Sequence, residues 1–513
     1  MDNVQWCSQD EQNAFIRSCI MSYPDTPEQA AVIAWKGERL VVIAFAGTGK
    51  TSTLRRYAEE NPTERMLYVA YNRAIRDEAE QKFPFNVTCK TSHQLAWPTI
   101  GKHYSHRLVN TLRLTDVARA LNSRNWLQSR LALDVLNRFM CSAAPQISAE
   151  HAPDADDCKG LEPAQILLSA RKVWDMMSAR QGDFPVTHDT YLKLYQLSKP
   201  NLSSRYTTLL FDEAQDANPV TSAIVLNQTC RVVLVGDAHQ QIYRFRGADN
   251  AMQSPQLEKA DRLWLTHSFR FGPEVAQVAN RLLALKGETH QVTGKGGSDR
   301  VLQTVPRTFG HHAVLHRSVC GVIRTALHWS LAGKKVFWVG GMESYKIEDL
   351  LDLYWFSIDM AERMQHDRLT REYRDYNEYL QIAEDTGDVE MKQAIFILEQ
   401  FFPLPDRLNT LREQRVSVES DADITVCTAH RSKGLEWDRV SLHDDFADIL
   451  DPEMSESKRN DEINLLYVAA TRARQTLITD PILSELLAQP QPGELLPSVH
   501  ENSETVEGEN DVA

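Results

Sequence analysis

The sequence predicts an α/β protein with two parallel-sheet cores, each carrying a mainly helical insertion. Short apolar runs typical of buried strands alternate with helical patterns, and they fall into two groups on either side of about residue 270. The runs are 40–45, 66–70, 207–212, 231–236, 336–340 and 423–428. Two longer stretches, 100–190 and 345–420, have helical patterns without such runs, so we interpret them as insertions.

This pattern predicts four segments of structure and a tail. The expected segments are 1–98 with 200–270 for the first core, 99–199 for its insertion, 271–345 with 421–489 for the second core, and 346–420 for the shorter second insertion. The tail, 490–513, contains three prolines and six acidic residues but no lysine or arginine. Such a composition predicts disorder.

Composition excludes several protein classes. Of the 513 residues, 42% are hydrophobic and 25% are charged, which is ordinary for a globular protein of two to four domains. No apolar run approaches the roughly 18 residues of a membrane span, and the first residues lack the pattern of a secretory signal. The eight cysteines form no C-x-x-C pair and are expected to be reduced thiols. We therefore expect a cytoplasmic protein without a membrane partner.

Charge is segregated along the chain. The net charge of −14 argues against a generic basic nucleic-acid coat protein, but it does not exclude a local nucleic-acid site. Residues 100–140 hold seven basic residues against two acidic ones. Those seven are Lys102, Arg107, Arg113, Arg119, Arg124, Arg130 and Arg138. This segment is either a solvated helix face or a track for a phosphate backbone.

The run 41–45 leads into a small-residue turn and then Lys50-Thr51, which opens a helical pattern. This is the pattern of a phosphate-binding loop, in which backbone N–H groups cradle phosphates, Lys50 reaches the terminal ones and the Thr51 hydroxyl holds Mg²⁺. Ala44 stands where the usual first glycine would be, and a small residue there still permits a tight turn. The expected nucleotide contacts are Ala46, Gly47, Thr48, Gly49, Lys50, Thr51 and Ser52.

A second apolar run ends in Asp212-Glu213. A carboxylate at the end of a neighbouring strand can hold Mg²⁺ opposite Thr51, so we expect Thr51 and Asp212 to be the metal ligands. Glu213 can then orient or deprotonate the attacking water. Phosphoryl transfer needs positioning and charge neutralisation, which these residue types supply.

Four further stretches stand in a fixed order along the chain: 185–194, 235–248, 268–271 and 428–436. With the two motifs above, they resemble the UvrD-like branch of superfamily 1 DNA helicases, and most of all the helicase portion of the F-box DNA helicases. The resemblance runs from about 25 to 480. We expect no F-box-like extension before it, and therefore no ubiquitin-ligase role. The resemblance implies two RecA-like P-loop cores that sandwich ATP and Mg²⁺.

The resemblance assigns three residues to the nucleoside. Gln29 would pair with the adenine edge, Phe269 would stack on adenine, and Glu436 would touch the ribose or another part of the nucleotide. Gln29 has a second interpretation, because Thr26 and Pro27 before it form the pattern of a helix start. Both interpretations are compatible with one structure.

It also assigns residues to the γ-phosphate. Gln240 would sense that phosphate and couple it to the DNA groove. Arg270 and Arg472 would be arginine fingers that reach the nucleotide only when the cleft closes, since a guanidinium fork suits the spread charge of the transition state. The expected catalytic set is Lys50, Asp212, Glu213, Gln240, Arg270 and Arg472.

Other motif residues are expected to face DNA. An aromatic ring can stack on any base, which gives sequence-tolerant single-strand binding. Relatives often carry tryptophan where Phe245 stands, and phenylalanine can still stack. For the two aromatic residues of this set, Tyr243 and Phe245, the alternative is a position in the hydrophobic core. The expected DNA contacts are Asn72, Thr91, His93, Tyr243, Phe245 and His430.

The resemblance implies an ATP-dependent DNA helicase or translocase, an ATP hydrolase, that moves 3′ to 5′ on single-stranded DNA in repair or recombination control. Expected partners are single-stranded DNA and junctions with duplex, with recombinase filaments or a nuclease as further candidates, and the expected location is the nucleoid or nucleus. The alternative is a DNA-stimulated ATPase subunit of a larger complex, with a protein-stripping, defence or sensing role. The residues alone leave open the polarity and the choice of DNA over RNA.

Overall fold

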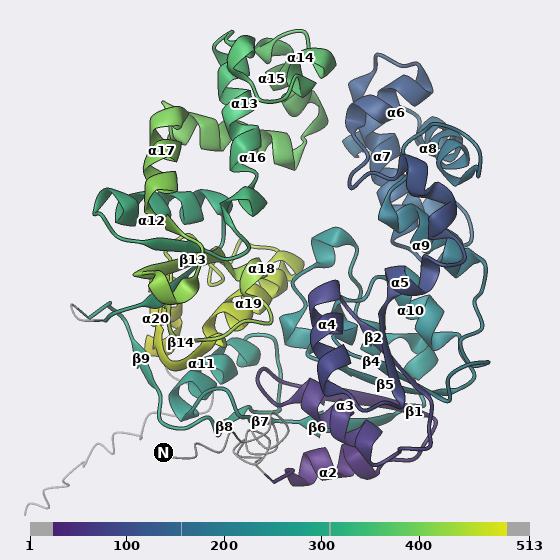
Figure 1. Cartoon of the computed structure of the whole chain (residues 1–513), viewed down its shortest axis with the longest axis vertical. Coiled ribbons are helices and arrows are strands. Elements are labelled where there is room, and N and C mark those ends of the chain that lie inside the picture. The colour runs from purple at the N-terminus through teal and green to yellow at the C-terminus, as the bar shows by residue number, and fades with distance from the viewer. Residues whose placement is uncertain (1–23, 155, 307–308, 490–513) are drawn as a thin grey trace, which may run out of the picture.

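Two parallel β-sheets form the centres of two cores that lie side by side (Figure 1). The computed structural model describes residues 24–154, 156–306 and 309–489, so the disorder expected for 490–513 lies outside the described residues. All strand pairings in both sheets are parallel, which confirms the α/β fold class. In the described part of the chain, no helix combines the length and apolarity needed to cross a membrane.

The first core is built on a six-stranded sheet of order β3-β2-β4-β5-β1-β6. Its strands are β1 (Arg39–Ala44), β2 (Met66–Ala70), β3 (Val87–Thr91), β4 (Thr208–Phe211), β5 (Arg231–Gly236) and β6 (Asp261–Leu265). Successive side chains of a strand point to opposite faces. Accordingly, Val41 packs into one apolar cluster while Leu40 and Val42 pack into another on the opposite face.

The second core is built on a seven-stranded sheet of order β12-β11-β13-β10-β14-β15-β9. Its strands are β9 (Arg300–Leu302), β10 (His312–His316), β11 (Val336–Trp338), β12 (Arg415–Val416), β13 (Ile424–Thr428), β14 (Trp437–Leu442) and β15 (Ala473–Ile478). A short pair, β7 (His267–Ser268) with β8 (Thr293–Gly294), lies where the chain passes between the cores. Phe45, Ala46 and Ile242, from the segments after β1 and β5, belong to the same apolar cluster as the second core, so the two cores share packing.

Helices cover both sheets and form the two insertions. Those of the first core are α2 (Pro27–Ala34), α3 (Lys50–Glu59), α4 (Arg73–Lys82), α5 (Ser92–Ala96) and α10 (Pro219–Leu226). Those of the second core are α11 (Pro273–Ala284), α12 (Val319–Leu331), α18 (Ala429–Ser432), α19 (Glu456–Ala470) and α20 (Pro481–Ala488). The first insertion holds α6 (Leu114–Leu121), α7 (Trp126–Met140), α8 (Pro163–Ser178) and α9 (His188–Leu197). The second holds α13 (Ile347–Ser357), α14 (Arg368–Glu372), α15 (Tyr376–Thr386), α16 (Val389–Gln400) and α17 (Leu404–Gln414).

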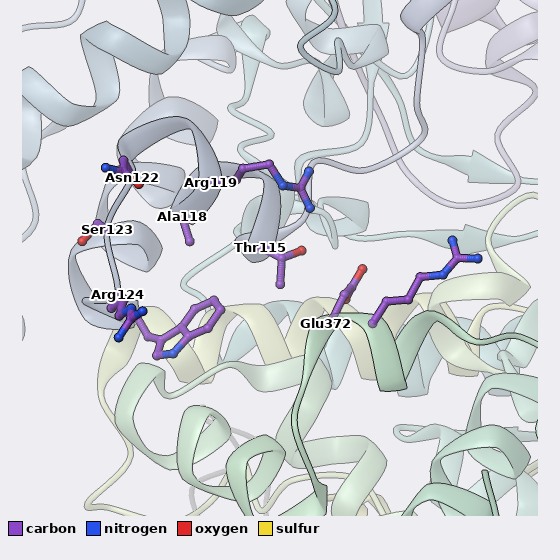
Figure 2. Close-up of a pocket in the computed structure, with 9 residues that line it drawn as sticks. Thr115, Ala118, Arg119, Asn122, Ser123, Arg124 and Glu372 are labelled. Atoms are coloured by element: carbon purple, nitrogen blue, oxygen red, sulfur yellow. The ribbon is translucent and has the colours of Figure 1, made fainter.

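Both insertions rise on the same side of the molecule and meet there (Figure 1). Arg113 pairs with Glu372, and Arg130 pairs with Asp388. Leu114 joins the apolar cluster of the second insertion. A cavity lies at this junction, between one face of α6 and α14 (Figure 2). Its lining comprises Thr115, Ala118, Arg119, Asn122, Ser123, Arg124, Trp126, Arg371 and Glu372.

Strand order brings three loops of the first core to one edge of its sheet. The carboxyl ends of parallel strands meet at the same edge, which is where such sheets bind ligands. The loops that follow β1, β4 and β5 carry Lys50, Asp212 and Gln240 respectively. We expected Asp212 on a strand next to β1, and this was wrong because β5 lies between β4 and β1. The site therefore spans three strands.

Candidate nucleotide and nucleic-acid site

The loop after β1 has the backbone of a phosphate cradle. Gly47 and Gly49 both have positive φ, at 74° and 78°, and Gly49 caps the start of α3. A Cβ on Gly47 would lie 2.5 Å from the Ser268 hydroxyl, so only glycine fits there. Ala44 is the last residue of β1 and is buried, so the missing first glycine falls in ordinary strand conformation. The loop thus presents the N-terminus of α3, a favourable site for phosphate, with Ser52 exposed in the first turn.

The expected metal ligands lie side by side. The Thr51 hydroxyl donates a hydrogen bond to an Asp212 carboxylate oxygen at 2.7 Å, and the Tyr68 hydroxyl donates to the same oxygen at 2.7 Å. Burial, together with the neighbouring charge of Glu213, raises the pKa of Asp212. A hydroxyl and a carboxylate on adjacent elements match the oxygen ligands that Mg²⁺ prefers, so these residues fit the ion.

Glu213 is held between two lysines. Its backbone is left-handed, with φ 51°. The carboxylate lies 3.3 Å from the Lys50 ammonium and 3.4 Å from that of Lys433, and it accepts a hydrogen bond from the Gln215 amide at 2.6 Å. Burial acts to raise the pKa of Glu213, but the charges of Lys50 and Lys433 outweigh it, and the pKa is lowered overall. Glu213 is therefore an ionised carboxylate at neutral pH, able to orient a water or accept its proton.

Arg472 reaches the first core from the second. It is 1% exposed, and its guanidinium donates to the backbone oxygen of Val468 at 2.9 Å and to the Gln240 side-chain oxygen at 3.3 Å. The Gln240 amide in turn donates to Asp237 at 2.7 Å. Burial lowers the pKa of Arg472 to about 9, helped by the charge of Arg270. Arg472 and the expected phosphate sensor are thus in direct contact.

Arg270 lies against the phosphate loop. A Cβ on Gly47 would be 2.7 Å from the Arg270 Cβ, and the backbone N–H of Phe269 donates to the Gly47 oxygen at 2.9 Å. The Arg270 guanidinium donates to Glu436 at 2.7 Å and to the Thr471 backbone oxygen at 3.2 Å. Arg270 therefore stands at the loop that carries Lys50, whereas Arg472 contacts Gln240 in the loop after β5.

The expected nucleoside contacts already have protein partners. Gln29 forms a capping box with Thr26, and its amide donates to the Thr48 backbone oxygen at 3.3 Å. The interpretation of Gln29 as part of a helix start is thus confirmed, and its side chain lies next to the phosphate loop. Phe269 is half-buried beside that loop, and Glu436 is exposed and paired with Arg270. These side chains lie close enough to the phosphate loop to contact a nucleoside. Gln29 would first have to give up its hydrogen bonds to Thr26 and Thr48.

Aromatic side chains gather between the two cores. The Tyr243 ring stacks on Tyr71, with centroids 5.6 Å apart, and its hydroxyl donates to the His430 backbone oxygen at 3.0 Å. Phe245 packs edge-on against the His430 ring at 5.6 Å. Phe245 is 69% exposed, which rules out the core interpretation for it. We call Tyr71, Tyr243, Phe245 and His430 the aromatic cluster.

Three other expected DNA contacts perform local structural tasks. Asn72 caps α4 through the Ile75 N–H at 2.9 Å, and Thr91 caps α5 in a capping box. His93 packs edge-on against Tyr191 of the first insertion, with ring centroids 5.8 Å apart. Exposed Asn72 remains next to the aromatic cluster through its neighbour Tyr71, whereas His93 is turned towards α9.

The basic segment is divided by burial. Arg107 is 7% exposed, and its guanidinium donates to backbone oxygens of Met176, Met177, Ala179 and Phe184. Arg107 therefore stabilises the fold, and the interpretation of Arg107 as part of a track for a phosphate backbone is wrong. Arg119 is exposed and lines the cavity between the insertions, together with Arg124 (Figure 2).

Sequence reasoning left out several residues at the site. Tyr68 bonds to Asp212, and Tyr71 completes the aromatic cluster. The Tyr467 hydroxyl accepts a hydrogen bond from the Ala46 N–H at 3.1 Å, so α19 touches the phosphate loop. Tyr68 lies within β2 and Tyr71 directly follows it, and the apolar run 66–70 could have drawn attention to that strand end.

Comparison with known families gives two matches. Residues 174–481 match the UvrD-like helicase C-terminal domain, and residues 28–246 match an AAA domain. Together these ranges contain the phosphate loop, Asp212, Gln240 and Arg472.

Curated relatives agree with those matches. The chain is 33% identical to F-box DNA helicase 1 of Gallus gallus over 94% of its own length and 51% of the relative. It is 32% identical to F-box DNA helicase protein 1 of Schizosaccharomyces pombe over 90% of its length and 58% of the relative. DNA helicase IV of Escherichia coli is 24% identical over 52% of the chain and 48% of the relative. The chain thus spans about half the length of the curated relatives it matches.

The first family model covers more than half of the chain. The chain therefore belongs to the UvrD-like helicases, a family of ATP-hydrolysing DNA helicases with the RecA-like P-loop fold.

Proposed function

We propose that this chain is an ATP-dependent DNA helicase or translocase that moves along single-stranded DNA. One arrangement carries the proposal: Glu213 of the first core pairs with Lys50 and with Lys433 of the second core, and Arg472 of the second core bonds to Gln240 of the first. The exposed ring of Phe245 belongs to the aromatic cluster between the cores. A nucleotide site shared by two cores can couple hydrolysis to their relative movement. We also propose that the cores and insertions follow the boundaries expected from the sequence.

In this proposal the first core holds the nucleotide. The N–H groups of the loop and Lys50 bind the phosphates, while Thr51 and Asp212 hold Mg²⁺, which neutralises phosphate charge when bound. Glu213 orients the attacking water and accepts its proton. Gln29, Phe269 and Glu436 contact the nucleoside.

Arg472 from the second core and Arg270, the last residue of the first, complete the site. Arg270 and Arg472 make charge-assisted contacts with the γ-phosphate that exist only while the nucleotide is intact. Gln240, which is already hydrogen-bonded to Arg472, contacts the γ-phosphate and couples its presence to the DNA groove. Loss of these contacts after hydrolysis lets the cores separate, because the nucleotide binds the closed arrangement more tightly than the open one.

DNA is proposed to cross the aromatic cluster. Stacking on Phe245 and Tyr243 is sequence-tolerant, and His430 ties the cluster to the second core. Asn72, Thr91 and His93 are proposed to contact the backbone from the first core. If grip alternates between the cores, each cycle of closing and opening advances the strand.

The finer parts of the proposal follow from the family. We propose 3′ to 5′ movement, action at junctions of single-stranded and duplex DNA, and a role in repair or recombination control at the nucleoid or nucleus. The names of the relatives support DNA as the substrate. Recombinase filaments or a nuclease are candidate partners.

The deciding measurement is ATP hydrolysis with and without single-stranded DNA, followed by unwinding of substrates with a 3′ or a 5′ tail. We expect DNA to stimulate hydrolysis in the wild-type chain and Lys50→Ala to abolish it, because the β- and γ-phosphates lose their cation. Lys82→Ala, an exposed lysine of α4, is the control and should behave as wild type. Equal turnover in Lys50→Ala would refute the site. Stimulated hydrolysis without unwinding of either substrate would favour the DNA-stimulated ATPase subunit instead.

A further inference from the structure

The cavity between the insertions has the size of a small-molecule site. Its volume is about 560 Å³, and pockets that hold small ligands measure roughly 300–1,000 Å³. One side is formed by α6, the turn after it and the start of α7, and the other side by α14 (Figure 2). The cavity therefore suits one nucleotide or a molecule of that size, and it exists only while the two insertions are together.

Three arginines line this cavity, Arg119 and Arg124 from the first insertion and Arg371 from the second, and all three are exposed. Arg119 lies 3.4 Å from Asp116, and Arg371 pairs with Asp367 at the start of its own helix. Arg124 has no ion-pair partner within the described part of the chain. Exposed pairs of this kind are weak, and a guanidinium fork binds phosphate oxygens well. These side chains are therefore available to a phosphate.

The acidic residue of the lining, Glu372, is already neutralised. Its side chain is 7% exposed, pairs with Arg113 and lies 3.5 Å from Arg368. Arg113 also donates to both carboxylate oxygens of Asp116, at 3.1 and 3.2 Å. The two acids are thus paired with arginines outside the lining, which leaves the cavity with a positive charge.

One buried hydroxyl of the lining has no partner. Thr115 is 9% exposed, and its hydroxyl forms no hydrogen bond with any described residue. Figure 2 shows Thr115 pointing from α6 into the space towards α14. A buried hydroxyl without a hydrogen bond is destabilising, so one that stands at a cavity wall indicates a ligand that accepts its proton. A phosphate oxygen is such an acceptor.

The lining also contains an aromatic ring. Trp126 is the first residue of α7, is half-buried, and packs against the apolar cluster of the second insertion. An aromatic ring held in this way can stack on a base of any kind. A phosphoserine side chain has no ring to use that surface, whereas a nucleotide carries both a phosphate and a base.

We propose that this cavity is a second nucleotide site, which binds a nucleoside 5′-phosphate with the phosphate on the arginines and Thr115 and the base on Trp126. It lies between the insertions, away from α3 and Lys50 (Figure 1), and it goes beyond the proposed function because no step of hydrolysis passes through it. A free mononucleotide and the 5′-phosphorylated end of a DNA strand both offer this chemistry. Because both insertions line the site, its occupant binds the joined arrangement and stabilises it.

The test measures binding of dAMP by isothermal titration calorimetry, with ADP and Mg²⁺ in excess to fill the site at the phosphate loop. We expect one dAMP per chain and slower amide hydrogen exchange in α6 and α14 when it is bound. Trp126→Leu should weaken dAMP about tenfold, the scale of one stacked base, and leave binding of inorganic phosphate unchanged. Arg119→Ala with Arg124→Ala should weaken both ligands. Arg65→Ala with Arg262→Ala, at exposed positions outside the cavity, is the control.

Thr115→Val distinguishes binding from a structural role. Valine has nearly the same shape but no hydroxyl, so the variant should bind dAMP about tenfold more weakly, as expected for the loss of a hydrogen bond to a charged group. Its melting temperature without ligand should not fall, since the change removes an unpaired buried hydroxyl. A lower melting temperature with unchanged dAMP affinity would contradict the place of the phosphate at Thr115.

Competition against dAMP identifies the source of the ligand. Displacement by a 5′-phosphorylated oligonucleotide, but not by the same strand with a 5′-hydroxyl, would assign the site to strand ends. Displacement by neither would assign it to the free mononucleotide.

Three results would overturn the inference. Equal displacement by both oligonucleotides would mean that internal phosphates bind there. Unchanged exchange of α6 and α14 with dAMP would mean that the nucleotide does not bind in the cavity. Protection of these helices by a phosphoserine peptide and not by dAMP would assign the cavity to a protein partner. DNA-stimulated ATP hydrolysis, which tests the proposed function, is measured separately and is not decided by any of these results.

Discussion

Arg107 and Arg119 lie in one basic segment, yet their surroundings give them different tasks. Arg107 is buried among backbone oxygens, whereas Arg119 is exposed at the cavity between the insertions (Figure 2). A guanidinium surrounded by protein acceptors cannot release a counterion from DNA, but an exposed one can. The charge of a residue is therefore a poor guide to its role until its burial is known.

We expect Arg119→Ala with Arg124→Ala to flatten the salt dependence of DNA binding. Each lost phosphate contact reduces the slope of log K against log salt by about 0.7 for single strands, so the double variant should lose about 1.4. Fluorescence anisotropy from low to moderate salt measures the slope. The control is Arg65→Ala with Arg262→Ala, two exposed arginines at the other end of the strands. An unchanged slope would make the cavity arginines solvated surface only.

Phe245→Ala should weaken single-strand binding and stepping while leaving basal ATP hydrolysis close to wild type. The ring is 69% exposed and stacking on a base contributes about 1–3 kcal/mol. Binding and basal turnover are measured on the same preparation. Phe245→Trp, with a larger ring, should bind at least as well as wild type. If Phe245→Ala binds DNA normally, the aromatic cluster is not the DNA path.

At the scale of elements, helix starts and strand ends position the site. Asn72 and Thr91 cap the helices after β2 and β3 and thereby fix where those chains turn over the sheet edge. His316 performs a comparable task in the second core. It ends β10, and its ring bonds to the Cys427 oxygen of β13 at 3.2 Å and to the Thr325 hydroxyl of α12 at 2.8 Å. The ring thus joins two strands and a helix without any contact with solvent.

His316 makes stability depend on pH. Burial lowers its pKa from 6.5 to about 4, helped by the neighbouring His443. Because the unfolded chain binds the proton more tightly, stability is full above the unfolded pKa and falls as pH drops from about 6.5 towards 4. The loss from pH 7 to pH 5 is about 2 kcal/mol for this group. Asp445, facing it, has a lowered pKa and so acts only at more acid pH.

Replacing His316 by asparagine keeps a donor for Cys427 but removes the titration. Chemical unfolding at pH 7 and pH 5 should then show a smaller difference in the free energy of unfolding than in wild type, by about 2 kcal/mol. His290→Asn, an exposed histidine, should leave the difference unchanged. An equal acid loss in His316→Asn and wild type would show that other groups cause it.

At the scale of the whole molecule, the two insertions form a second bridge between the cores, far along the chain from the nucleotide loop. Arg113 with Glu372 and Arg130 with Asp388 cross it, and Leu114 adds apolar contact. Each ion pair is partly exposed and contributes only a fraction of a kcal/mol to about 1 kcal/mol. The bridge is therefore strong enough to favour this arrangement and weak enough to open.

Asp388→Asn tests the bridge without disturbing the helix. Asp388 also caps α16 through the Met391 N–H at 3.0 Å, and asparagine caps equally well. The variant should raise amide hydrogen exchange in α7 and α15 by about two- to fivefold, as expected for the loss of up to about 1 kcal/mol, with the melting temperature nearly unchanged. Glu390→Gln, in the same helix, is the control. Unchanged exchange would mean that apolar contacts alone hold the insertions together.

The local sequence was sufficient to predict those strands and loops whose pattern depends only on residues close together along the chain. The runs that became β1, β2, β4 and β5 are almost entirely apolar because they lie between two helical layers. The phosphate loop could be predicted for the same reason, since its glycines and Lys50 stand close together in the sequence. Strands β3 and β6 escaped notice because they are the two edge strands of the sheet and carry polar residues, Thr88 and Lys90 in β3 and Asp261 and Arg262 in β6. In β10, polar histidines at both ends conceal a fully buried strand.

By itself the sequence determined the α/β class, the family and the motifs, because each is written in residues that stand close together along the chain. Only the tertiary structure decided how those motifs meet. It placed Asp212 on a strand two positions away from β1, and it brought Arg472 into contact with Gln240. It also paired Glu213 with two lysines and buried Arg107. The physical reason is that burial and ion pairing depend on partners far away along the chain, which strand order and the packing of the two cores bring together.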